Sequence, residues 1–107
     1  MKVWELGEQK GIASLRLVER PEPKPLPGQA VVAVKASSLN RRDIMLTEGK
    51  YQGTKPPNRI PLSDGAGDVV AVGDGVSNVK VGERVVATHF TPWLDGAFDP
   101  SYFAGDL

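Results

Sequence analysis

The stretch ASSLNRRDIMLTEGKYQGTKPPNRIPLSDGAGD, residues 36–68, decides how this chain folds. It begins at the end of an apolar run, passes through a short segment with helical capping signals, crosses a loop rich in Pro and Gly, and enters a second apolar run. Most of the residues that could carry chemistry lie within it. The segments on either side have the short β-branched runs and turn residues that are typical of strands in a scaffold.

Residues 41–48 are predicted to form a helix of about two turns. Asn40 is a preferred N-cap residue, and Asp43 stands three positions later, where an acidic side chain can complete a capping box. Gly49 can end the helix in the left-handed conformation.

Arg41 and Arg42 both fall in the first turn of this helix, where the positive end of the helix dipole disfavours cations. Two arginines beside free backbone N–H groups form a good anion site, so one interpretation is capture of a phosphate or a carboxylate. The other interpretation is two solvated arginines, or one that pairs with Asp43.

The rest of the chain predicts about five short strands. An apolar run and a run of alternating residues indicate a hairpin at 2–6 and 15–19. The run at 29–37 is nearly continuous in apolar residues, which favours a central strand. Further strands are predicted at 67–73 and 84–88. The fold class is therefore mainly β, a barrel or a sandwich with one short helix.

Composition limits the function. The chain has 107 residues, a formal net charge of +0 and no cysteine. One domain is expected at this length. A neutral chain without a basic block argues against nucleic acid or an anionic membrane as a partner, and no apolar run approaches the roughly 20 residues of a membrane-spanning helix. Disulfides and thiolate metal sites are excluded. We expect the protein in the cytoplasm.

Two other features leave alternatives open. Asp64 is either a buried acid in a pocket or a turn carboxylate, and the local pattern favours the turn. The Gly65–Gly67 pair does not open a helix, so a phosphate-binding loop is rejected. His89 is the only histidine, which makes a zinc site unexpected. The aromatic-rich tail, residues 90–107, either covers a cleft or is the end of a shortened chain.

The order of motifs resembles a known family. An apolar strand leads into SLNRRD, a short helix ends in EGKY, and a proline-rich loop enters PLSDGAGDVVAVGDGVSNVKVGERV. This is similar to the N-terminal GroES-like domain of the medium-chain dehydrogenase/reductase superfamily, which includes zinc alcohol dehydrogenases and zinc-less quinone oxidoreductases. The resemblance runs from Met1 to about Thr88. It implies a GroES-like distorted β-barrel for residues 1–107, with the short helix near residues 41–48.

The departures from the family pattern concern zinc. Zinc-dependent members carry a cysteine ligand where this chain has Asn40, and His-Glu where it has Ser63 and Asp64. The resemblance therefore implies the zinc-less branch, with no metal site in this domain.

The resemblance also implies roles for site residues. Asn40 and Tyr51 would be the catalytic residues that hydrogen-bond a substrate carbonyl, and Arg41 would contact the pyrophosphate of the cofactor. Arg42 replaces a small hydroxyl residue that relays protons in the zinc enzymes, so that relay is in doubt here. The substrate pocket would include Arg42, Ser63 and Asp64.

The implied function is the substrate side of an oxidoreductase that uses NADP or NAD and acts on a carbonyl, a quinone or an enone. In the family a Rossmann domain follows and binds most of the nicotinamide cofactor, and no strand–Gly-rich turn–helix unit is found in this sequence. We therefore expect a chain truncated before such a domain and inactive alone. A homodimer is one arrangement open to the complete enzyme. The alternative is a stand-alone binding or assembly module with a co-chaperonin-like barrel.

Overall fold

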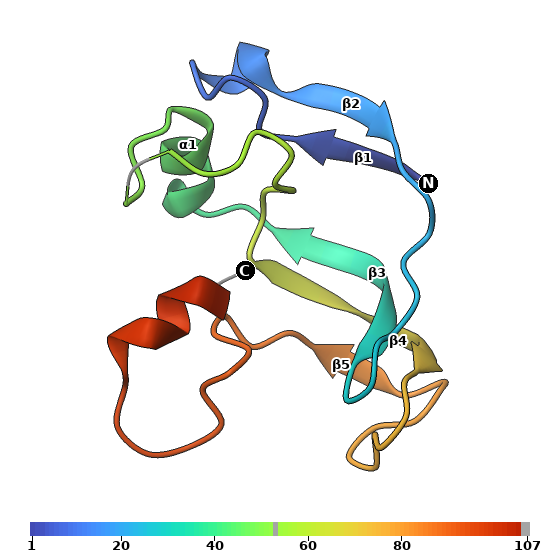
Figure 1. The fold of residues 1–107 in the computed structure, drawn as a ribbon. Coiled ribbons are helices and arrows are strands. Elements are labelled where there is room, and N and C mark those ends of the chain that lie inside the picture. Colours follow the sequence, from blue (N-terminus) through green and yellow to red (C-terminus); the bar gives the residue numbers. More distant parts are fainter. Residues whose placement is uncertain (53, 106–107) are drawn as a thin grey trace. The chain divides into compact units, whose positions relative to one another are not determined.

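The computed structural model of the protein describes residues 1–52 and 54–105 (Figure 1). These residues divide into two compact units, one made of Met1–Glu22 with Leu39–Leu62, the other of Pro23–Ser38 with the chain from Ser63 onward. The elements in chain order are β1 (Lys2–Glu5), the 3₁₀ helix η1 (Ile12–Ser14), β2 (Arg16–Glu19), β3 (Ala30–Ser38), α1 (Arg41–Thr47), β4 (Asp64–Val72), β5 (Arg84–Val86) and the 3₁₀ helix η2 (Pro100–Gly105).

The first unit contains the predicted hairpin and the predicted helix. β1 and β2 pair antiparallel, with Val3 opposite Val18, and η1 lies in the connection between them. Leu6 and Leu46 are fully buried and form the centre of this unit. None of the helices in the described part of the chain is long and apolar enough to cross a membrane.

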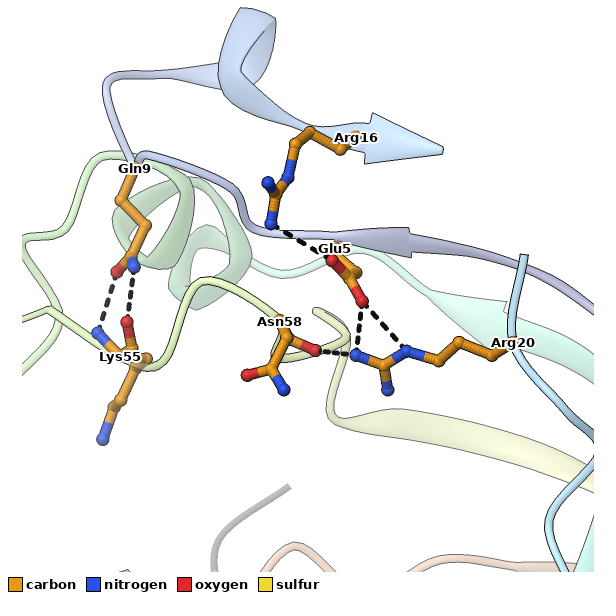
Figure 2. A network of polar contacts seen from close by, with 6 residues as sticks. All are labelled: Glu5, Gln9, Arg16, Arg20, Lys55 and Asn58. Carbon is orange, nitrogen blue, oxygen red and sulfur yellow. Dashed lines mark hydrogen bonds and ion pairs between the residues drawn. The ribbon is translucent and has the colours of Figure 1, made fainter. Parts of the chain in front are cut away.

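A buried carboxylate organises one side of this unit (Figure 2). Glu5 ends β1 and is only 7% exposed. Its carboxylate accepts a hydrogen bond from Arg16 at 3.2 Å and two from Arg20 at 2.9 and 2.5 Å. Arg20 also donates to the backbone carbonyl of Asn58, in the proline-rich loop. Because a buried charge is tolerated only when it is paired and hydrogen-bonded, the two arginines stabilise the Glu5 carboxylate.

The proline-rich loop is also held by hydrogen bonds to its backbone groups. The side-chain amide of Gln9 donates to the carbonyl of Lys55 at 2.6 Å and accepts from the N–H of Lys55 at 2.8 Å (Figure 2). The N–H of Leu6 donates to the carbonyl of Arg59 at 3.0 Å. The loop after the helix, which carries several prolines and few ladder donors, thus gains its order from side chains of the first hairpin.

In the second unit the strands form a three-stranded antiparallel sheet in the order β3–β4–β5. The prediction that 29–37 is a central strand is wrong: β4 occupies the middle, and most of β3 is exposed. A continuous apolar run indicates a strand, but it does not identify which partners flank it. β4 buries Val69 at 1% exposure, and β5 is shorter than predicted.

The mainly β fold class with one short helix is confirmed. The strand pairs of residues 1–52 and 54–105 make two separate hydrogen-bonded sheets and do not close into a ring. The helix begins after Asn40 and ends before Gly49, whose φ is 68°, as the capping signals predict.

Replacing Glu5 by Gln tests the buried network. The neutral amide leaves Arg16 and Arg20 without their shared counter-charge, so the free energy of unfolding should fall by about 2–3 kcal/mol in urea titrations. The control is Glu19→Gln, because the Glu19 side chain is 73% exposed and its ion pair with the amino terminus should contribute less than about 0.5 kcal/mol. Equal effects of the two substitutions would contradict the assignment.

A second test concerns the contact between β3 and β4. A Cβ atom at Gly67 would overlap the backbone carbonyl of Ala33, whereas one at Gly65 would meet nothing closer than the Val34 methyls at 3.9 Å. Gly67→Ala should therefore lower the free energy of unfolding by about 2–3 kcal/mol. The matched change Gly65→Ala should alter it by no more than about 1 kcal/mol. A tolerated Gly67→Ala would show that the strands do not pair this closely.

Candidate functional site

The helix start in the first unit holds the predicted catalytic asparagine. Asn40 is the N-cap of α1, with φ −123° and ψ 157°, and its N–H donates to the Asp43 carboxylate at 2.7 Å. Asp43 is 5% exposed and completes the capping box that the sequence predicts. Asp43 is thus engaged in capping, and Asn40 is exposed at the point where the helix begins.

Arg42 and Tyr51 are brought together within the same unit. The guanidinium carbon of Arg42 lies 4.8 Å from the centroid of the Tyr51 ring, and both residues are half-buried. The chain reverses after the helix because Gly49 and Gln52 both have positive φ, 68° and 49°. A cation over an aromatic face is worth about 0.5–1 kcal/mol or more, so this contact restrains the ring. Arg41 is exposed.

The second unit holds the other two predicted pocket residues. Asp64 is the first residue of β4, so its prediction as a turn carboxylate is wrong. Its side chain is exposed and accepts a hydrogen bond from the Ser38 hydroxyl at 3.1 Å. Ser63, directly before it, is buried at 5% exposure. The Ser38 contact was missed because it depends on the register of β3 against β4, which pairs Ser38 with Asp64.

A hollow of about 480 Å³ lies at this end of the sheet. Its lining comes from three neighbouring strand ends, residues 36–38, 64–66 and 86–87. Asp64 lines this hollow and Ser63 does not contribute to it. The volume falls within the range of about 300–1,000 Å³ that is usual for small-molecule sites.

Asp68 and Arg84 form an exposed ion pair across β4 and β5. The Arg84 guanidinium donates to the Asp68 carboxylate at 2.9 Å, and this hydrogen bond lowers the pKa of Asp68 below its ordinary value of 3.8. The same contact raises the pKa of Arg84. Because the folded-state pKa of Asp68 is depressed, the pair favours the folded state above the unfolded pKa. This effect is lost as the pH falls through the folded value.

The donor atoms do not fit a zinc ion. Among residues 1–52 and 54–105, no group of three or more His, Asp or Glu residues is placed to hold a metal, and the sequence has no cysteine. His89 packs its ring edge-on against Phe90, with the centroids 4.5 Å apart.

The aromatic tail packs on itself. Phe90 lies 5.1 Å from Phe98 and 5.4 Å from Phe103 between ring centroids, and Trp93 stacks on Tyr102 at 6.3 Å. The segment after β5 is therefore a small aromatic cluster, which ends in η2. Residues 106–107 of the predicted tail lie outside the described residues.

Fold and site together define a GroES-like domain: short antiparallel strands, one capped helix between β3 and β4, and a glycine-rich entry to β4. Residues 26–100 match the family model of the alcohol dehydrogenase GroES-like domain, and the chain belongs to that family. The predicted membership of the medium-chain dehydrogenase/reductase superfamily is confirmed.

The relatives include a dehydrogenase-like protein and a protein named for synaptic vesicles. The chain is 40% identical over 98 residues to a zinc-type alcohol dehydrogenase-like protein of Schizosaccharomyces pombe, covering 91% of this chain and 28% of that protein. It is 41% identical over 78 residues to the human synaptic vesicle membrane protein VAT-1 homolog, covering 71% of this chain and 20% of the relative.

Several solved structures are also similar to this chain. The human VAT-1 homolog-like protein superimposes with a TM-score of 0.76 at 32% identity, covering 81% of this chain and 28% of that one. The Escherichia coli quinone oxidoreductase complexed with NADPH superimposes with a TM-score of 0.69 at 32% identity, covering 80% of this chain and 26% of the enzyme. The chain thus spans only about a quarter of the length of these proteins.

Proposed function

We propose that this chain is the substrate-side domain of a zinc-independent oxidoreductase that uses NADP or NAD and reduces a carbonyl, a quinone or an enone. The observation that carries the proposal is the helix start, where Asn40 is exposed at the N-cap and Tyr51 is restrained by Arg42. The similarity to the NADPH-bound quinone oxidoreductase of Escherichia coli supports it.

The proposed chemistry uses two hydrogen-bond donors. The carboxamide of Asn40 and the phenol of Tyr51 each donate to the substrate oxygen, which draws electron density from the carbon that accepts hydride. Nicotinamide supplies the hydride when it is bound. Neutral donors can perform this polarisation where zinc-dependent enzymes use a Lewis acid.

The two arginines of the helix start act beside these donors. Arg41 is exposed in the first turn of α1, where its guanidinium can contact a pyrophosphate. Arg42 belongs to the substrate pocket and acts through the Tyr51 ring. Ser63 and Asp64, which the resemblance assigns to the substrate pocket, belong to the second unit, where Ser63 is buried and Asp64 begins β4.

The cofactor requires more protein than these residues provide. Every strand pair within residues 1–52 and 54–105 is antiparallel, so the parallel strand–helix–strand unit that binds dinucleotides is not formed by them. We infer that a Rossmann domain elsewhere in the complete enzyme holds most of the cofactor. We place that enzyme in the cytoplasm, acting on a small molecule, with a homodimer as one arrangement open to it.

The proposal predicts that the 107-residue chain does not oxidise NADPH with a quinone at a measurable rate. A chimera in which this chain replaces the matched segment of the Escherichia coli quinone oxidoreductase should have turnover, followed as loss of NADPH absorbance. In that chimera Asn40→Ser keeps a helix-capping side chain but shortens the donor, so kcat should fall by about 10²-fold or more.

The control is Asn78→Ser, the same exchange at an exposed position outside the helix, which should leave kcat unchanged. Rapid turnover by the chain alone, or equal kcat values for the two serine variants, would overturn the proposal.

A further inference from the structure

The segment that follows β1 runs antiparallel to the proline-rich loop. The N–H of Leu6 donates to the carbonyl of Arg59 at 3.0 Å, and the N–H of Gly7 donates to the carbonyl of Pro57 at 2.8 Å. Gln9 then leaves the extended conformation, because its φ is 57°. Beyond Gly7, the next hydrogen bond to the loop therefore comes from a side chain.

The side-chain amide of Gln9 makes this contact (Figure 2). Its Nε2 atom donates to the carbonyl of Lys55 at 2.6 Å, and its Oε1 atom accepts from the N–H of Lys55 at 2.8 Å. One side chain thus binds both backbone groups of Lys55, as a residue of a neighbouring antiparallel strand does. Gln9 is 7% exposed, so water competes little for these two hydrogen bonds.

The backbone of Gln9 also contacts the turn after the helix. A Cβ atom at Gly49 would lie 3.4 Å from the carbonyl oxygen of Gln9, and Gly49 itself has a φ of 68°. The N–H of Lys50, the next residue, donates to a carbonyl of α1 at 2.9 Å. The turn that packs on Gln9 and the hydrogen bonds at Lys55 lie on either side of Tyr51 along the chain.

We propose that Gln9 is a positioning residue for the reaction. By fixing Lys55 and packing on Gly49, it holds the Tyr51 ring where the phenol donates to the substrate oxygen. Gln9 spends both hydrogen-bonding groups of its amide on Lys55 and acts through Tyr51. A glutamine with positive φ is uncommon, and its burial and two hydrogen bonds stabilise that conformation here.

The inference rests on the proposed function for the role of Tyr51, but the position of the ring is measurable without turnover. The guanidinium carbon of Arg42 lies 4.8 Å from the centroid of the Tyr51 ring. Nuclear Overhauser effects between the Arg42 side chain and the ring protons therefore report whether the loop keeps its path.

The first experiment measures these effects in the 107-residue chain. Gln9→Met keeps the length of the side chain and removes both hydrogen bonds, which shifts the balance between a held and a released loop by about 30-fold. The Arg42–Tyr51 effects should fall at least about two-fold. Gln29→Met is the matched control: the exposed amide of Gln29 also bonds a backbone group, the N–H of Leu26, and its loss should leave these effects unchanged.

Gln9→Glu tests the same point within one sample, and it remains informative if Gln9→Met does not fold. A carboxylate accepts from the N–H of Lys55 but repels the Lys55 carbonyl, whereas a carboxylic acid restores the donor. Because burial raises the pKa of a carboxyl group, the Arg42–Tyr51 effects should be weak at about pH 8 and recover at about pH 5. The unchanged chain should show no such recovery.

The second experiment uses the chimera with the Escherichia coli quinone oxidoreductase. Gln9→Met should lower kcat by about 10-fold and change KM by less than about two-fold, because the misplaced donor acts mainly in the transition state. In a chimera that already carries Tyr51→Phe, the same change should lower kcat by less than about two-fold, since Gln9 acts through the missing hydroxyl.

Two results would overturn the inference: Arg42–Tyr51 effects that persist in Gln9→Met, or an equal loss of kcat with and without the Tyr51 hydroxyl, which is what a general effect on folding gives. The failure of the proposed function is a different result. Tyr51→Phe by itself would then leave kcat unchanged, while the ring would still depend on Gln9.

Discussion

The close approach of β3 and β4 at Gly67 is the contact on which the second unit depends. A side chain there would overlap the carbonyl of Ala33, so β3 and β4 approach this closely only with glycine at this position. The same pairing fixes the register that puts Ser38 opposite Asp64. Gly67 therefore affects the hollow indirectly, because the shape of the hollow follows from the strand register that this glycine permits.

The first unit depends on side-chain hydrogen bonds to its proline-rich loop. Its loop after the helix is rich in proline and cannot supply a regular ladder of backbone donors. Side chains compensate: Gln9 pairs with the backbone of Lys55, and Arg20 joins the buried Glu5 to Asn58. This order extends to the loop that carries Tyr51, the ring proposed to contact a substrate.

The sequence was most informative where structure is local. Asn40, Asp43 and Gly49 predicted both ends of the helix, since caps depend on residues a few positions apart. The hairpin followed from alternation in the same way. The family resemblance also came from local motifs.

Features that depend on tertiary register were not predictable. The position of β3 at the edge of its sheet, and of Asp64 in a strand, depend on which strands pair and in what register. The contact of Arg42 with Tyr51 depends on the turn after the helix, where Gly49 has positive φ. Gln52, directly after Tyr51, also has positive φ, and the sequence gives no signal for it.

The central claim is that this chain provides substrate contacts and that nicotinamide is held mainly by another part of the enzyme. Titration with NADPH, followed by nicotinamide fluorescence, tests it most directly. The account predicts no saturable change up to about 1 mM, because one exposed arginine offers only a weak phosphate contact. A saturable change with a micromolar Kd would contradict it.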